Sequence, residues 1–266
     1  MDLLVNGQPA YAYTGGKPVD AALPCVVFIH GALHDHSVWT LLARWFAHHR
    51  HSVLAVDLPG HGRSAGAPLG DVEALAGWTL ALLDAAGVQR AALVGHSMGS
   101  LIALEAAARA PQRATRLVMV GSAYPMKVSD ALLATARDAP LKAIDMVNAF
   151  SHTSIAAKPS FPGPGAWLHG GNRALMRRVQ AAQFGVNLFH HDFSVCDRYA
   201  TGLQAASAVQ CAVSFILGEH DQMTTPKAAR ELATALKANV TLLPCGHALM
   251  QERPDEVLAA LRTALA

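Results

Sequence analysis

The chain has 266 residues, of which 52% are hydrophobic and 15% charged, and its formal net charge is +2. This length suits one large α/β domain or two small ones, and the composition is typical of a globular rather than a disordered protein. No run of lysine and arginine stands out, which argues against a protein that binds nucleic acid. Because no stretch of about twenty uncharged apolar residues occurs, we expect no membrane-spanning helix.

The N-terminal segment and the cysteines bear on the cellular compartment. Residues 1–16 lack the basic start and long apolar core of a signal peptide, so we expect none. Cys25, Cys196, Cys211 and Cys245 are scattered without C-x-x-C spacing. They are predicted to be buried thiols in a reducing cytoplasm rather than a disulfide or zinc framework.

The first half of the chain alternates between predicted strands and predicted helices. Short apolar runs predict strands at 3–6, 10–13, 25–29, 52–57, 91–95 and 117–120, and helical patterns cover 38–48, 72–86 and 100–109. The first two strands suit a hairpin around Gly7. The later strands are continuous apolar runs, which indicate burial on both faces, as in a parallel sheet covered by helices.

From residue 125 to residue 210 this alternation stops. Predicted helical pieces cover 129–139, 141–150, 172–183 and 189–206, and a run rich in proline and glycine interrupts them at 158–165. We expect a helical cap here, inserted into an α/β core formed by residues 1–124 and 211–266. The alternation resumes with strands at 212–217 and 240–243 and with helices at 226–237 and 253–265.

The most informative motif is Gly-His-Ser-Met-Gly at 95–99, which matches the nucleophile elbow G-x-S-x-G. A predicted strand precedes the motif and a predicted helix follows it. Such a sharp turn forces the serine into strained backbone geometry, and side chains at Gly95 and Gly99 would collide. We therefore predict that Ser97 is a nucleophile held above the sheet edge, at the positive end of the following helix.

A serine hydroxyl needs a base to take its proton, and the base needs a carboxylate to orient it. In the chain order of this motif, the acid and then the histidine follow the serine on loops after later strands. Asp221 follows the predicted strand 212–217, and His247 follows the predicted strand 240–243. We predict Asp221 as the acid and His247 as the base. Glu219 is the rival carboxylate, and Asp221 could instead only cap the next helix.

The tetrahedral intermediate of acyl transfer carries an oxyanion, which backbone N–H groups must stabilise. Met98 is predicted to supply one N–H group, because its amide begins the helix after the serine. The second N–H group should come from residues 30–33, His-Gly-Ala-Leu, which follow the predicted strand 25–29. The amide of Ala32 is the first choice, and the amide of Leu33 is the alternative.

Together these motifs resemble the α/β-hydrolase superfamily, in its lid-bearing branch of esterases, lactonases, C–C hydrolases and cofactor-free haloperoxidases. The matching segments follow the family's order, at 28–31 with Trp39, 57–64, 95–99, 218–221 with Pro226, and 246–247. The resemblance implies a mostly parallel eight-stranded sheet with a helical cap between strands six and seven. It implies a mainly structural role for 57–64. Ser100 and Cys245 depart from the pattern, because the family often has glycine at both positions.

The pocket can be predicted only coarsely, from residues that flank the catalytic positions and from aromatic and histidine residues of the cap. The candidates are Leu33, Met223, Ala248, Leu249, Phe150, His152, Trp167 and Phe189. Most of the cap residues could equally form the core of the cap. The apolar character indicates a small or medium apolar acyl substrate. Histidine-rich clusters at 34–36 and 48–51 lack the spacing of a zinc site, and we predict neither a metal nor a cofactor.

We predict a serine hydrolase that cleaves carboxylic esters through an acyl-enzyme, with a small ester-like molecule as its partner. A lactonase, thioesterase, acyltransferase or cofactor-free perhydrolase would use the same triad. The serine nucleophile argues against haloalkane dehalogenases and epoxide hydrolases, and Ala248 after the histidine argues against a C–C bond hydrolase. A peptidase would need acidic cap residues near the site, for which Asp192 and Asp197 are available. A slow-turnover ligand receptor is the alternative from another class. The oligomeric state is left open.

Overall fold

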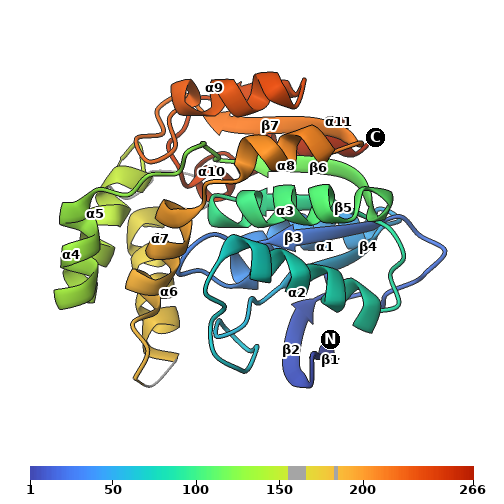
Figure 1. The fold of residues 1–266 in the computed structure, drawn as a ribbon, viewed down its shortest axis with the longest axis horizontal. Coiled ribbons are helices and arrows are strands. Elements are labelled where there is room, and N and C mark those ends of the chain that lie inside the picture. The colour runs from blue at the N-terminus through green and yellow to red at the C-terminus, as the bar shows by residue number, and fades with distance from the viewer. Residues whose placement is uncertain (155–165, 183–184) are drawn as a thin grey trace.

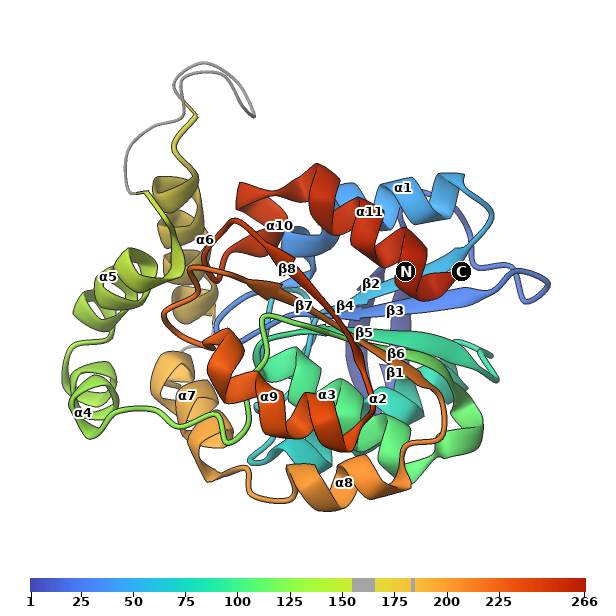
Figure 2. The same ribbon diagram turned by 90° about the horizontal axis from the view of Figure 1, so that it is seen from above.

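The computed structural model describes residues 1–154, 166–182 and 185–266 of the chain. A central sheet carries helices on both faces, and a further group of helices lies beyond one end of the strands (Figures 1 and 2). The predicted proline- and glycine-rich interruption at 158–165 lies outside the described residues.

The sheet has eight strands in the order β1-β2-β4-β3-β5-β6-β7-β8. Along the chain they are β1 (Asp2–Val5), β2 (Gln8–Tyr13), β3 (Cys25–Ile29), β4 (Ser52–Val56), β5 (Ala91–His96), β6 (Ala114–Val120), β7 (Ala212–Gly218) and β8 (Asn239–Leu243). The pairs β1–β2 and β2–β4 are antiparallel, and the remaining pairs are parallel. The prediction of a mostly parallel eight-stranded α/β sheet is confirmed.

Helices cover both faces of this sheet. Alternate side chains of a strand point to opposite faces, and the strands are apolar on both. In β3, Val26 and Phe28 pack into one buried cluster and Val27 and Ile29 into the other. The first face carries η1 (His36–Trp39), α1 (Thr40–His48), α10 (Leu249–Glu252) and α11 (Pro254–Leu265). The second face carries α2 (Val72–Ala85), α3 (Met98–Arg109), α8 (Gly202–Ala208) and α9 (Pro226–Ala235), with η2 (Pro111–Arg113) after α3.

The edge strand β8 is less buried than the central parallel strands β3, β4 and β5. Its first four residues are exposed, and the side chains of Val240 and Leu242 are each 49% exposed. The reason is its position, because β8 is the last strand of the sheet and has a neighbour on one side only.

Between β6 and β7 the chain forms α4 (Asp130–Asp138), α5 (Pro140–Ser151), α6 (Leu168–Ala182) and α7 (Leu188–Arg198). Figure 1 shows these helices beyond the end of the sheet to which the arrowhead of β7 points. They therefore lie over the carboxyl ends of the parallel strands, where α/β proteins bind their ligands. The division into a core and a cap at residues 125 and 210 stays a prediction, and we use cap here for α4 to α7.

The single helix predicted at 189–206 is wrong, because the structure has α7 and α8 with a break between them. Tyr199 ends α7 in an extended conformation, with φ −64° and ψ 119°. Its ring is buried and its hydroxyl donates a hydrogen bond of 3.0 Å to Glu105 on α3. The chain thus leaves the cap at Tyr199, and α8 packs on α3 and α9 of the core.

Within the described ranges, no helix has the length and apolar character needed to cross a membrane. The four cysteines are free thiols, three of them buried and Cys211 half-buried.

Candidate active site

The predicted elbow forms a tight turn between β5 and α3. Ser97 has φ 51° and ψ −120°, a left-handed conformation that a non-glycine residue adopts only under constraint. A Cβ atom on Gly95 would lie 2.0 Å from the carbonyl oxygen of Gly99, and one on Gly99 would lie 2.4 Å from that of Ile29. Both glycines are therefore sterically required, as predicted, and they fix the direction of the Ser97 side chain.

Ser100, where the family often has glycine, supports this turn. Its hydroxyl lies 2.6 Å from the carbonyl oxygen of Ser97 and 2.7 Å from the hydroxyl of Ser122, just after β6. Ser100 thus ties the first turn of α3 to the loop after β6. We interpret its departure from glycine as a change in local packing.

The structure brings Asp221 and His247 together. The Nδ1 atom of His247 lies 2.8 Å from Oδ2 of Asp221, and both side chains are buried. Burial acts to raise the pKa of Asp221, but the charge and hydrogen bond of His247 and the hydrogen bonds from Thr224 outweigh it and lower this pKa to about 2. The carboxylate is therefore charged at neutral pH. The rival Glu219 is exposed, and Thr225, rather than Asp221, caps α9.

Thr224 is a site residue that the sequence reasoning missed. Its hydroxyl donates a 2.7 Å hydrogen bond to Oδ2 of Asp221. The hydroxyl oxygen of Thr224 also lies 3.1 Å from Nδ1 of His247. The backbone amides of Met223 and Thr224 donate to the other carboxylate oxygen, each at 2.8 Å. The position of Thr224, three residues after an aspartate in a turn, is the local signal that could have predicted this support.

His96, the residue before Ser97, contacts the backbone of His247. Its Nε2 atom lies 3.0 Å from the carbonyl oxygen of His247, and the two rings are 4.8 Å apart. Burial and the neighbouring histidines hold the pKa of His96 well below its usual value, so its ring is neutral. A neutral ring that donates from Nε2 to this carbonyl oxygen fixes the loop on which His247 lies.

The loop after β3 lies against the elbow, as predicted for an oxyanion site. A Cβ atom on Gly31 would come within 3.2 Å of Cβ of Ser97, and Ala32 borders the same cavity as Ser97. The amide of Leu33, the alternative to that of Ala32, instead donates a 2.8 Å hydrogen bond to the buried carboxylate of Asp192. Leu33 is therefore excluded as the second N–H group for the oxyanion.

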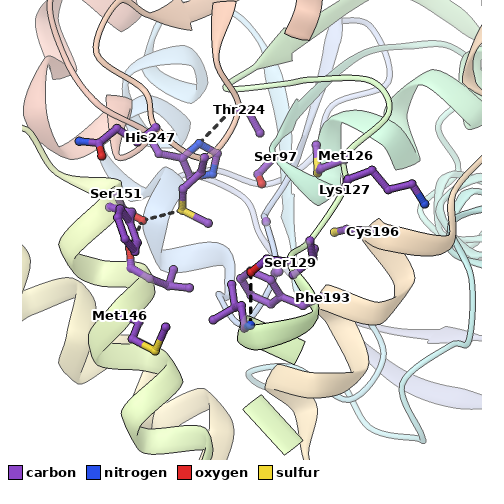
Figure 3. Close-up of a pocket in the computed structure, with 18 of the residues that line it drawn as sticks. Ser97, Met126, Lys127, Ser129, Met146, Ser151, Phe193, Cys196, Thr224 and His247 are labelled. Carbon is purple, nitrogen blue, oxygen red and sulfur yellow. Dashed lines mark hydrogen bonds between the residues drawn. The ribbon is translucent and has the colours of Figure 1, made fainter. Parts of the chain in front are cut away.

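A cavity of about 270 Å³ opens above Ser97 and His247. Figure 3 shows these two residues on one side of the open space, and Met146, Ser129 and Phe193 of the cap on the other. Most of the wall is apolar and comes from the cap and the loops beside it. The apolar residues are Met126, Val128, Leu132, Met146, Val147, Phe150, Met176, Phe193, Cys196 and Met223.

Two of the eight predicted pocket residues, Met223 and Phe150, border this cavity. Ala248 instead borders an adjoining space of about 20 Å³ beside His247. Leu33, Leu249 and Phe189 are fully buried core residues, which corrects their prediction as pocket residues.

Backbone direction and packing explain these corrections. Leu33 has φ 55°, which points its side chain into the core, and Phe189 stacks on Phe193 one helical turn further from the cavity. His152 and Trp167 also lie elsewhere. The buried ring of His152 contacts the carbonyl oxygen of Asn148 and the side-chain oxygen of Gln251. Trp167 is 52% exposed.

Asp35, His36 and Asp57 are residues of types that can bind a metal ion, and their ligand atoms lie within 4.8 Å of one another. Protein donors occupy these carboxylates. Asp57 accepts hydrogen bonds from the backbone amides of His36 and Arg63, and Asp35 pairs with Arg178. We therefore treat this cluster as a structural network that fixes the segment 57–64.

Cys245 is an unreactive thiol beside the site. Its side chain is fully buried, and burial raises the pKa of the thiol to about 12. At neutral pH the thiol is therefore protonated and weakly nucleophilic.

An open parallel sheet with a serine elbow, facing a buried histidine–aspartate pair at the carboxyl ends of its strands, defines the class of α/β hydrolases. The model of the Alpha/beta hydrolase family matches residues 26–260. The chain belongs to this family.

Known proteins resemble the chain in part or along its whole length. It is 41% identical over 110 residues to the dihydrolipoyllysine-residue acetyltransferase component of the acetoin cleaving system of Pseudomonas putida, covering 41% of the chain and 28% of that protein. It is 35% identical over 118 residues to a lipase of Mycobacterium tuberculosis, covering 41% of the chain and 44% of that protein. The chain matches 28% to 36% of the length of several curated relatives.

Among solved structures, the enol-lactonase from Burkholderia xenovorans LB400 superposes on the chain with a TM-score of 0.84. The sequence identity is 24%, and the match covers 100% of this chain and 99% of that chain. At this identity the likeness shows the fold alone.

Proposed function

We propose that the protein is a serine hydrolase that cleaves carboxylic esters through an acyl-enzyme. The observation that carries the proposal is the buried pair of Asp221 and His247, placed at one cavity with a serine in the strained conformation of an elbow. The lipase among the sequence relatives supports this class of reaction.

In the proposed mechanism, Ser97 attacks the acyl carbonyl carbon while Nε2 of His247 takes the hydroxyl proton. The Nδ1 atom of His247 donates to the charged carboxylate of Asp221, which fixes the tautomer and stabilises the imidazolium. The backbone amides of Ala32 and Met98 donate to the oxyanion. The imidazolium then gives its proton to the leaving alkoxide, and water repeats these steps on the acyl-enzyme.

The cavity supports an apolar acyl group of small or medium size. Its volume of about 270 Å³ is near the lower end of ordinary ligand pockets, and its wall is mainly methionine, valine, leucine and phenylalanine. The unbranched methionine side chains suit acyl groups of different shape. The small ester-like partner and a cytoplasmic location both stay predictions.

The first experiment measures hydrolysis of p-nitrophenyl acetate, butyrate and octanoate by the wild type, Ser97→Ala and His247→Ala. Ser207→Ala is the matched control, because this serine is exposed on α8 and its hydroxyl bonds only a carbonyl oxygen of the same helix. We expect kcat to fall by about 10⁴-fold or more in the two site variants and to stay unchanged in the control.

Equal rates in the wild type and Ser97→Ala would overturn the proposed mechanism. A folded wild type that binds small ligands but turns over none of the esters would support the ligand-receptor alternative. Bromination in the presence of peroxide and acetate would identify the perhydrolase alternative.

A further inference from the structure

A carboxylate of the cap is buried against the core, directly behind the proposed oxyanion site. Asp192, on α7, is 1% exposed. Its Oδ2 atom accepts a 2.8 Å hydrogen bond from the backbone amide of Leu33 and lies 2.8 Å from Nε2 of His61. Its Oδ1 atom lies 3.2 Å from Nδ1 of His191, the preceding residue. One side chain of the cap thus holds two separate loops of the core.

The first loop that Asp192 holds is strained at its contact residue. Leu33 has φ 55°, in the left-handed region that a branched, bulky side chain avoids. Such a conformation persists only where its surroundings impose it. Two constraints act on Leu33, namely the hydrogen bond from its amide to Asp192 and the complete burial of its side chain. The preceding residue is Ala32, whose amide we assign to the oxyanion.

The second loop contains His61, whose ring is held as a cation by its neighbours. Its Nδ1 atom lies 3.1 Å from the carbonyl oxygen of Pro59, and its Nε2 atom faces Asp192. Both neighbours are acceptors, so both contacts are hydrogen bonds only when both ring nitrogens carry protons. Burial acts to lower the pKa of His61, but the charge and hydrogen bond of Asp192 outweigh it and raise this pKa.

We infer that Asp192 is a positioning residue for the proposed hydrolysis. The charge of His61 keeps the carboxylate ionised and in place, and the carboxylate holds the amide of Leu33. This contact fixes the peptide of the strained turn, so that the amide of Ala32 points toward the oxyanion. Asp192 acts through Leu33 and does not touch the substrate. The inference rests on the proposed function.

This arrangement makes one helix serve two purposes. Through Phe193 and Cys196, α7 forms part of the cavity wall, and through Asp192 it fixes the oxyanion loop. The same helix therefore contributes to the acyl pocket and to the position of the oxyanion loop, through different residues. Asp192 is also one of the two cap carboxylates that a peptidase could use to bind a free amine. It is directed into the core, where Leu33, His61 and His191 contact both of its oxygens.

The test compares Asp192→Leu, which removes the acceptor, with Asp192→Asn, which keeps one. In Asp192→Asn the side-chain oxygen can take the place of Oδ2 and accept from the amide of Leu33 and from Nε2 of His61, while the amide nitrogen takes the place of Oδ1 beside His191. The matched control is Asp145→Asn, which removes a cap carboxylate paired with Arg173 inside the cap. We expect Asp192→Leu to lower kcat on p-nitrophenyl butyrate by about 10²-fold. Its KM should stay within about threefold of the wild type, because binding of the acyl group is unchanged.

Asp192→Asn should retain kcat within about tenfold of the wild type, and Asp145→Asn should match the wild type. If Asp192→Leu fails to fold, Asp192→Ala is the second variant, because water can fill the vacated space and solvate the two donors. The same loss of kcat is expected, since a water molecule does not fix the loop. Unchanged kcat in a folded Asp192→Leu or Asp192→Ala variant would overturn the inference.

A second measurement does not depend on turnover. Hydrogen exchange of a peptide spanning residues 31–36 should be faster in Asp192→Leu than in the wild type and Asp145→Asn. Exchange as slow as in the wild type would overturn the inference even if no ester were hydrolysed. Failure of the proposed function has a different signature, since Ser97→Ala would then keep the activity of the wild type while this exchange difference remained.

Discussion

Two regions of the molecule contain a buried aspartate paired with a histidine at the same distance of 2.8 Å. At the sheet edge, Asp221 pairs with Nδ1 of His247, and at the junction of cap and core, Asp192 pairs with Nε2 of His61. The second nitrogen of His61 is closed off by the carbonyl oxygen of Pro59. His247 instead borders the cavity, and its side-chain contacts with Asp221 and Thr224 are both at Nδ1.

The neighbour of the second ring nitrogen decides what such a pair can do. A histidine with acceptors on both sides stays protonated and serves as a fixed charge. A histidine with one nitrogen directed to a cavity can take and give a proton. The same two residue types thus suit catalysis in one region and positioning in the other, and the following variants separate the two roles.

The largest difference between the pairs should appear when each aspartate becomes asparagine. Asp221→Asn removes the charge that stabilises the imidazolium and favours the wrong tautomer of His247, so we expect kcat to fall by about 10⁴-fold. Asp192→Asn should lose no more than about tenfold, as argued above. Steady-state kinetics on p-nitrophenyl butyrate measure both. Equal losses in the two variants would contradict the division of roles.

The cap–core pair should dominate stability instead. His61→Leu leaves the carboxylate of Asp192 buried without its cation, which costs about 3–5 kcal/mol of the free energy of unfolding. Urea unfolding at pH 6 measures this loss. Arg137→Gln, which removes the exposed ion pair with Asp138, is the control and should leave the unfolding midpoint unchanged. A His61→Leu variant as stable as the wild type would show that the pair does not hold cap and core together.

A smaller effect is expected at Thr224, which contacts the Asp221–His247 pair. Thr224→Val removes the hydroxyl that donates to Asp221, and loss of a hydrogen bond to a charged group costs about 1.5–3 kcal/mol. We expect kcat/KM to fall by about tenfold or somewhat more. Thr224→Ser, which keeps the hydroxyl, should restore most of the activity. If the serine variant lost as much as the valine variant, shape rather than the hydrogen bond would be responsible.

The smallest effect concerns pH. Because the pKa of His61 is raised above its ordinary value of 6.5, the stabilisation from its pairing is complete below pH 6.5 and is lost as the pH rises through the raised pKa. Between these limits the difference in unfolding free energy between the wild type and His61→Gln should shrink by about 1.4 kcal/mol per pH unit. The groups facing His61 are Asp192, Asp57 and His30.

Of these groups, the neighbouring histidine does not titrate in this range, because burial and the charge of His61 lower the pKa of His30 to about 4. The pH dependence of stability from the Asp221–His247 pair has the opposite sign. The lowered pKa of Asp221 contributes stability above its ordinary value of 3.8, and this is lost as the pH falls toward about 2. Urea titrations from pH 6 to pH 9 test the first statement. A difference that stayed constant over this range would contradict a charged His61.

The residues at the carboxyl edge of the sheet could be predicted because short sequence patterns mark each of them. Strand, turn and helix follow one another around Ser97, and Asp221 and His247 each come directly after a strand, so parallel pairing alone brings these loops to one edge. Thr224 was within reach of the same reasoning.

The junction of cap and core was not predictable in this way. Asp192 lies 131 residues from His61 and 159 residues from Leu33 along the chain, and no local pattern links them. The pocket prediction was wrong at Leu33 and Phe189 for a related reason, since the burial of these side chains depends on the backbone turn after β3 and on packing between helices.

The unequal attachment of the cap helices has a consequence for redesign of the substrate range. The helices α4 and α5 contribute Leu132, Met146, Val147 and Phe150 to the wall of the cavity. α7 contributes to the wall as well, but it carries Asp192. Libraries aimed at new acyl groups should therefore diversify those four positions and leave α7 intact, because variation there would alter selectivity and rate at once.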